Sequence, residues 1–297
     1  MQKGGDNVAK KGGFFRSNWA YLIWFIFYFL FSVAILDSFV KNVWLSFGVG
    51  ALLYAVSVGF ALSPLGEALA RFLEGARHIE TQEDRDYLIP LFEEVYAEAQ
   101  AFTPSLNKDI KLYITDDMFA NAFALGRKTV AVTRGAVMTF SREELKGLLA
   151  HELGHHANGD TKALMIKLVG NGFFTAIILV LRLCVSIIQV ISSAMRGRGL
   201  GWAMFAFAMA ILKISLDLAI FLILFIGDII IAINSRYSEY LADEYAYQIG
   251  YGEELKQSLS ILHKLTLPGK MKLSERLKAS HPHTLARIAR LEKLLYS

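Results

Sequence analysis

The sequence predicts a mainly α-helical integral membrane protein with a small β-sheet, and three observations support this prediction. Hydrophobic residues make up 54% of the 297 residues and charged residues only 20%, against roughly 45–50% and about 25% in average globular chains. Four long stretches are almost free of charge, and two short segments alternate as β-strands do. The composition excludes an intrinsically disordered chain, and a single cysteine excludes a disulfide framework.

The N-terminal part, residues 1–63, is predicted to hold a basic tail and two transmembrane helices. Residues 19–36 and 43–63 contain no charged side chain, and each comes close to the roughly 20 residues that cross a bilayer. A cleaved signal peptide is the alternative for the first stretch. Its apolar core is longer than the usual ~7–15 residues, and no clear small-residue cleavage site follows it, so we interpret it as a retained span.

Residues 164–233 are predicted to form a hydrophobic hairpin of two further transmembrane helices. Charges interrupt this hairpin at Arg182, Lys213, Asp217 and Asp228. Charged groups inside a bilayer are costly but tolerated when paired. A hairpin that lies partly in protein is the alternative.

Opposite charges fall at matching depths in this hairpin. Arg182 and Asp217 lie at nearly equal distances from a turn at about residues 196–201, and so do Lys167 and Asp228. We therefore predict that Arg182 and Asp217 pair and fix the register of the two helices. Coincidence in a chain with few such charges is the alternative.

The remaining pieces, residues 64–163 and 234–297, are predicted to form the two parts of one domain on the cytoplasmic side. Basic residues are concentrated at the inner ends of the spans, which is the bias found in cytoplasmic loops. Four crossings also return both pieces to the same side. The nine inner basic residues are Lys3, Lys10, Lys11, Arg16, Arg71, Arg77, Lys162, Lys167 and Arg236, against Lys41, Arg196 and Arg198 at the outer turns.

The first cytoplasmic piece is expected to contain both helices and strands. An acidic amphipathic pattern predicts a helix over residues 84–100, and residues 110–114 and 129–133 are predicted strands. Residues 121–125 are predicted to form an edge strand. Ser141 and Glu144 form a capping box, which predicts a helix that ends near Asn158-Gly159.

That helix carries the pattern His151-Glu152-Leu153-Gly154-His155. Residues i and i+4 lie about 40° apart on a helix, so both imidazoles reach one metal ion. Glu152 lies beside that face, where it contacts a water rather than the ion. His156 points roughly 100° away from His155 and is not counted as a ligand. A surface helix with two unrelated histidines is the alternative.

A catalytic zinc site needs a third protein ligand, and the segment 235–243 supplies a carboxylate. Glu239 lies on a second predicted helix, and Asp243 follows it by one turn, where it is placed to hold a ligand histidine by its other ring nitrogen. The hydrophobic hairpin occupies most of the 84 residues between His155 and Glu239, and it reads as an insertion between two ligand helices.

Taken together, these motifs resemble the HtpX family of membrane zinc endopeptidases. The residues that carry the resemblance are His151-Glu-Leu-Gly-His155, Asn158-Gly159-Asp160, Ser235-Arg-Tyr-Ser-Glu239-Tyr-Leu-Ala-Asp243, Asn121-Ala122-Phe123-Ala124 and Ser280-His281-Pro282 with Arg287. The resemblance covers essentially the whole chain. It implies a gluzincin-type metalloprotease domain at the cytoplasmic face of the cell membrane, which cuts misfolded or damaged membrane proteins in quality control and the stress response.

The resemblance also implies roles for some of the residues that match the family pattern. One Zn²⁺ per chain is held by His151, His155 and Glu239, and Glu152 is the general base. His281 stabilises the oxyanion, with an ordinary His-Pro turn as the alternative. Asp243 and Asp160 support the metal ligands from outside, and the substrate strand is contributed by Asn121, Ala122, Phe123 and Ala124.

Two other functions were weighed. A CAAX-type prenyl endoprotease shares the zinc motif, but such proteins resemble seven-span chambers and four spans are predicted here. A non-catalytic membrane scaffold with a relic motif would not need Glu152, which is intact. The expected partners are the lipid bilayer and membrane-protein substrates, with other membrane proteases as candidates and no nucleic acid.

Overall fold

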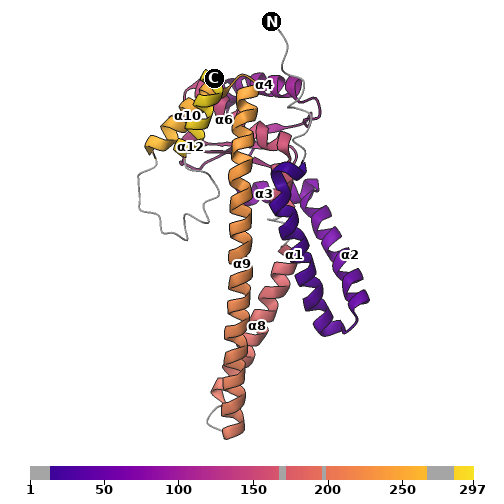
Figure 1. Cartoon of the computed structure of the whole chain (residues 1–297). Coiled ribbons are helices and arrows are strands. Elements are labelled where there is room, and N and C mark those ends of the chain that lie inside the picture. The colour runs from indigo at the N-terminus through magenta and orange to yellow at the C-terminus, as the bar shows by residue number, and fades with distance from the viewer. Residues whose placement is uncertain (1–13, 167–171, 196–198, 266–283) are drawn as a thin grey trace.

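The long apolar stretches form helices that extend from one side of the head, the part of the molecule that contains the β-sheet and the shorter helices (Figure 1). The structure is a computed structural model and describes residues 14–166, 172–195, 199–265 and 284–297. It is mainly helical with one small sheet, as predicted. The extended helices are α1 (Phe14–Val40), α2 (Val43–Ala61), α8 (Gly172–Ala194) and α9 (Leu200–Gln248).

Of the four predicted transmembrane helices, the structure offers one as a candidate membrane span. Among the described residues, α2 alone is long and apolar enough to cross a membrane by length and composition. Within the residues whose side chains are described, the apolar segments of the other three helices are shorter: Trp19–Ala34, Arg182–Ala194 and Leu200–Ser215. The remaining spans stay a prediction.

Helix α9 runs without a break from the hydrophobic hairpin into the head, and α8 packs along its lower part (Figure 1). The predicted ion pair between these helices is confirmed. The Nε atom of Arg182 lies 2.8 Å from Oδ1 of Asp217, and Nζ of Lys213 lies 3.1 Å from Oδ2 of the same carboxylate. The second match in depth, Lys167 with Asp228, lies outside the described residues and side chains.

The sheet of the head has the strand order β1-β3-β2. β3 (Thr129–Thr133) is central and pairs in parallel with β1 (Lys111–Thr115) and antiparallel with β2 (Ala122–Leu125). Gly126 adopts φ 61° in the turn between β2 and β3. The predicted strands are confirmed, and β2 lies at an edge of the sheet as expected.

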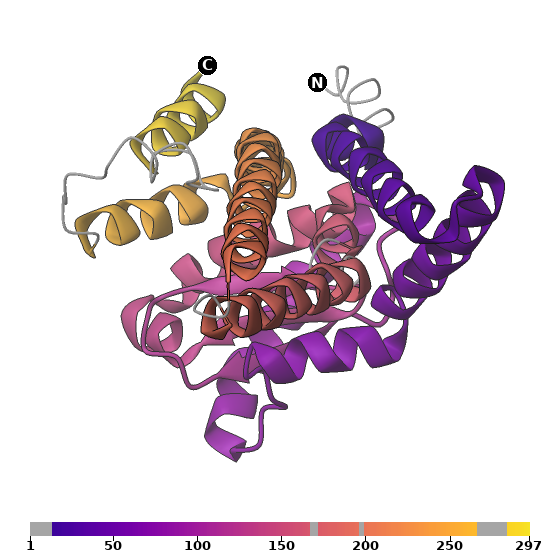
Figure 2. The ribbon, with the colours of Figure 1, turned by 90° about the horizontal axis from the view of Figure 1, so that it is seen from below.

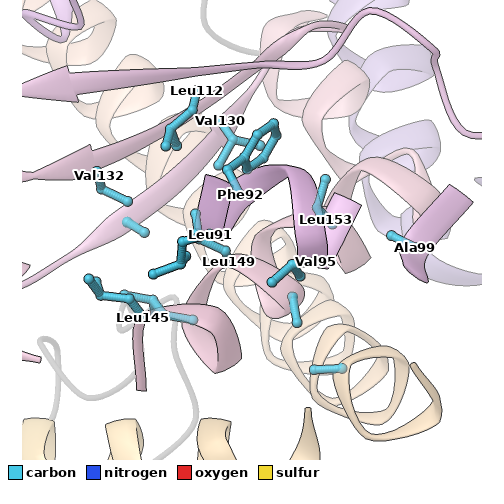
Figure 3. Close-up of a cluster of buried hydrophobic side chains, with 14 of the residues drawn as sticks. Leu91, Phe92, Val95, Ala99, Leu112, Val130, Val132, Leu145, Leu149 and Leu153 are labelled. Carbon is cyan, nitrogen blue, oxygen red and sulfur yellow. The ribbon is translucent and has the colours of Figure 1, made fainter. Parts of the chain in front are cut away.

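Helices α4 (Gln82–Phe102) and α6 (Arg142–Asn158) pack against each other, and their apolar faces form the main hydrophobic core with the sheet (Figure 3). Both helices were predicted. The capping box of Ser141 and Glu144 is present, and Gly159 ends α6 in the left-handed conformation with φ 78°. Core side chains that Figure 3 labels include Leu91, Phe92, Val95, Val130, Leu149 and Leu153.

Shorter helices complete the head. Seen from below, α10 and α12 lie on one side of α9, and α1 and α2 lie on the other (Figure 2). A Cβ atom on Gly147 of α6 would come within 2.2 Å of the Leu255 nitrogen, so the backbones of α6 and α10 meet directly there. The shorter helices are α3 (Pro64–Leu73), α5 (Arg134–Thr139), α7 (Asp160–Met165), α10 (Gly252–Leu265) and α12 (Thr284–Tyr296).

We predict that Asp217→Asn destabilises the chain by about 0.5–2 kcal/mol, the range that spans double-mutant cycles and model peptides for polar contacts between membrane helices. The reason is that Arg182 and Lys213 then lose their shared counter-charge. Unfolding of the full chain in lipid bicelles, titrated with a denaturing detergent, measures the change. Arg182→Gln combined with Asp217→Asn should cost less than the sum of the two single changes, and strict additivity would contradict the pair.

Candidate metal centre

Two histidines of α6 and one glutamate of α9 converge at the interface of these helices. One ligand atom from each of His151, His155 and Glu239 lies within 4.8 Å of the others. The Nε2 atoms of the histidines are 3.3 Å and 3.6 Å from the two Glu239 carboxylate oxygens. The i, i+4 spacing places both imidazoles on the side of α6 that faces α9. The structure thus brings together all three residues named as ligands from the sequence.

The other ring nitrogen of each histidine is held by a carboxylate. Nδ1 of His151 lies 3.0 Å from Oδ1 of Asp243, and Nδ1 of His155 lies 2.9 Å from Oδ2 of Asp160. A carboxylate at Nδ1 favours a proton there, which leaves Nε2 with its lone pair toward a cation. Asp243 reaches this position one helical turn after Glu239. Asp160 reaches it because the chain reverses at the left-handed Gly159.

A glycine between the two histidines lets α6 and α9 approach closely. A Cβ atom on Gly154 would lie 3.0 Å from Cα and 3.1 Å from the carbonyl oxygen of Ala242, which is tighter than most real contacts. Ala242 is itself fully buried. The backbones therefore touch at the level of the cluster, and the short Glu239 side chain reaches both histidines.

Arg287 of α12 is a site residue to which sequence reasoning gave no role. Its guanidinium donates to Asp243 through Nη2 at 2.6 Å and Nε at 2.9 Å, and Nη1 lies 2.8 Å from Glu239. Although burial opposes its charge, Asp243 and Glu239 raise the pKa of Arg287 above its usual value. One signal in the sequence could have indicated that Arg287 is buried. Arg287 precedes the buried Leu291 by four residues and therefore lies on the same face of an amphipathic helix.

The residues present fit a divalent cation. Among the described residues, the carboxylates of Glu152, Asp160, Glu239 and Asp243 are buried around the cluster together with one arginine. Buried like charges are costly unless they are compensated, so this excess of negative charge favours a bound cation. Two imidazoles with one carboxylate form a ligand set used by catalytic zinc sites, which leave the fourth position open.

The neighbouring histidine does not join the cluster. The Nε2 atom of His156 lies 2.9 Å from the carbonyl oxygen of Thr129 in β3, and burial lowers the pKa of His156 to about 4. This side chain ties α6 to the sheet. It also lines a cavity of about 760 Å³ that the three candidate metal ligands do not line.

The other residues named from the sequence lie as follows. Glu152 is buried on α6 next to His151. His281 lies outside the described residues. Asn121 is exposed just before β2, Ala122 and Ala124 are buried, and Phe123 is half-buried in that strand.

Comparison with known proteins identifies relatives of this chain. The chain matches Peptidase family M48 over residues 84–295. It is 29% identical over 265 residues to Protease HtpX from Shewanella sp. (strain MR-4), a match that covers 82% of this chain and 88% of the relative. It is 30% identical over 266 residues to Protease HtpX from Shewanella baltica (strain OS185), with the same coverage.

A solved structure shares the fold. The crystal structure of S. mikatae Ste24p matches with a TM-score of 0.51 and 19% sequence identity. The match covers 92% of this chain and 63% of Ste24p, so this chain spans less than two thirds of the length of that protein. At this identity the likeness concerns the fold alone.

We predict that Gly154→Val weakens zinc binding and destabilises the chain by about 1–3 kcal/mol, the usual cost of overpacking. The added side chain has no room against Ala242 and must push α9, with Glu239, away from α6. Zinc affinity is measured by competition with a chelator, and stability by denaturant unfolding. Gly201→Val is the matched control, because nothing lies within 4 Å of a Cβ atom there. Equal zinc affinity in both variants would contradict the close approach as a determinant of the site.

Proposed function

Because this chain belongs to peptidase family M48, we propose that it is a zinc-dependent membrane endopeptidase. It hydrolyses peptide bonds of misfolded or damaged membrane proteins at the cytoplasmic face, in quality control and the stress response. The observation that supports this most directly is the cluster of His151, His155 and Glu239, with each histidine oriented by its own aspartate.

The proposed mechanism assigns the proton transfers to Glu152. Zinc, when bound, polarises the scissile carbonyl and lowers the pKa of water. The Glu152 carboxylate takes a proton from the attacking water and passes it to the leaving amine, so no covalent acyl-enzyme forms. Asp243 and Asp160 keep the two imidazoles in place during the reaction. His281 is proposed to stabilise the negative charge that develops on the carbonyl oxygen.

The edge strand β2 is the proposed docking site for the substrate backbone. Its described strand partner is β3, on one side. A peptide that adds to the other side forms main-chain hydrogen bonds, which do not depend on side-chain identity. Pairing of this kind allows one site to accept many sequences. The residues proposed to make it are Asn121, Ala122, Phe123 and Ala124.

The proposed place of the reaction is the membrane surface. Helix α9 carries both Asp217, in the hydrophobic hairpin, and Glu239 at the cluster. Glu239 follows Asp217 by 22 residues, which correspond to about 33 Å of helix, at least the thickness of a bilayer core. Because Asp217 belongs to the hydrophobic hairpin, this distance supports a cluster outside the bilayer, on the side where a membrane-protein substrate emerges. The excess of basic residues at the inner ends supports the cytoplasmic side.

We predict that Glu152→Gln retains zinc and loses nearly all proteolysis, because the ligands survive and the base does not. Glu239→Ala should lose zinc as well. Metal content by mass spectrometry and cleavage of casein by the detergent-solubilised protein measure the two effects. Glu143→Gln, an exposed change on the same helix, is the control. Cleavage by Glu152→Gln at the unmodified rate would refute the mechanism. If the unmodified protein cleaved prenylated CAAX peptides and not casein, the proposed substrate class would be wrong and a CAAX-type prenyl endoprotease would be favoured.

The proposed sidedness predicts which positions an impermeant reagent labels in intact cells. In a Cys184→Ser background, a cysteine at Ser105 should stay unlabelled until the cells are opened, because the head is cytoplasmic. A cysteine at Lys41, in the turn between α1 and α2, should be labelled from outside. Both positions are exposed in the structure. The reverse pattern would overturn the proposed orientation.

A further inference from the structure

One face of α3 carries a stripe of large apolar side chains that no described residue covers. Leu65 is 71% exposed, Leu69 41%, Phe72 80% and Leu73 70%. At about 100° per residue, these four side chains fall within an arc of roughly 100°. A single exposed leucine needs no explanation, whereas a contiguous stripe on one helix marks an interaction surface.

The opposite face of α3 fixes this helix to the head. Ala70 packs with Leu125 of β2 and Met165 of α7. The Glu67 carboxylate accepts hydrogen bonds from the turn between β2 and β3, at 3.1 Å and 3.0 Å from the nitrogens of residues 127 and 128 and at 2.6 Å from the Thr129 hydroxyl. These contacts prevent the helix from turning its apolar stripe inward.

The place of α3 in the chain identifies what covers the stripe. The 19 residues of α2 give a length of about 28 Å, close to the ~30 Å of a bilayer core. Both ends of a span lie at bilayer surfaces, and only Leu62 and Ser63 separate α2 from α3. The 10 residues of α3 are too few to cross again. In Figure 1, α3 lies at the level of the upper ends of α1 and α2.

We propose that α3 is an interfacial helix that lays Leu65, Leu69, Phe72 and Leu73 into the boundary between lipid headgroups and acyl chains. Burial of an apolar helix face at the boundary between headgroups and acyl chains is a common mode of membrane attachment. The partner is therefore the lipid bilayer rather than a second protein. Because Glu67 binds the β2–β3 turn, the lipid contact also sets the position of β2 relative to the membrane.

Site-specific fluorescence tests this proposal on the full chain in phosphatidylcholine nanodiscs. In a Cys184→Ser background, a cysteine at Phe72 is labelled with an environment-sensitive dye. Glu74→Cys is the matched control, because Glu74 is exposed at the same end of α3 but lies about 160° from Phe72 around the helix. We expect a shallow spin-labelled phosphatidylcholine to quench the dye at position 72, and aqueous iodide to quench the dye at position 74.

Equal quenching by iodide at both positions would overturn the proposal. So would energy transfer between two labelled copies at position 72 without lipid quenching, because a second copy of the chain would then cover the stripe. The depth measurement needs no catalysis, so its failure is distinct from failure of the proposed protease function.

A second experiment tests the consequence for β2 and rests on the proposed function. Phe72→Asp should lower cleavage of a membrane-inserted substrate while cleavage of casein stays unchanged, because the cluster at His151 is untouched. Equal losses for both substrates would show a general structural defect and would contradict the proposal that the lipid contact of α3 positions β2 relative to the membrane.

Discussion

The contact between Gly154 of α6 and Ala242 of α9 sets the geometry on which the candidate site depends. Ligand atoms from two separate helices must come within 4.8 Å of one another, whereas packed helix axes ordinarily stand about 8–10 Å apart. Small residues at the crossing allow the backbones to touch, so short side chains close the remaining distance. The sheet, α4 and α10 pack on other parts of α6 and hold it against α9.

Charge is the second constraint, and it explains the place of α12. Four buried carboxylates around two histidines would be unstable if their charge were not compensated. Arg287 of α12 binds both Asp243 and Glu239. Asp243 orients His151, and Glu239 is a candidate metal ligand. A single arginine leaves negative charge for a divalent cation. The same residues therefore stabilise the head and prepare it for metal.

Two structural links connect the hydrophobic segments with the candidate metal site and the substrate strand: one is a continuous helix, and the other is a set of hydrogen bonds. Helix α9 connects the Arg182–Asp217 pair with Glu239 without a break. Helix α3 connects the end of α2 with the β2–β3 turn through the Glu67 carboxylate. The ligand helix and the proposed substrate strand thus both take their positions from elements that begin in hydrophobic segments. A rigid link of this kind suits a site whose proposed substrates are themselves held in the bilayer.

The sequence by itself determined the features that follow from the regular geometry of helices and of one hairpin. The capping box at Ser141 and the i, i+4 histidines are local to one helix, and the depth match of Arg182 with Asp217 follows from equal residue counts on either side of the hairpin turn. The structure shows each of them. Only the tertiary structure decided that Arg287 binds Asp243, that Glu67 binds the β2–β3 turn, and that Gly154 meets Ala242. These contacts join residues far apart in the chain, and no local pattern encodes which distant surfaces will be packed together.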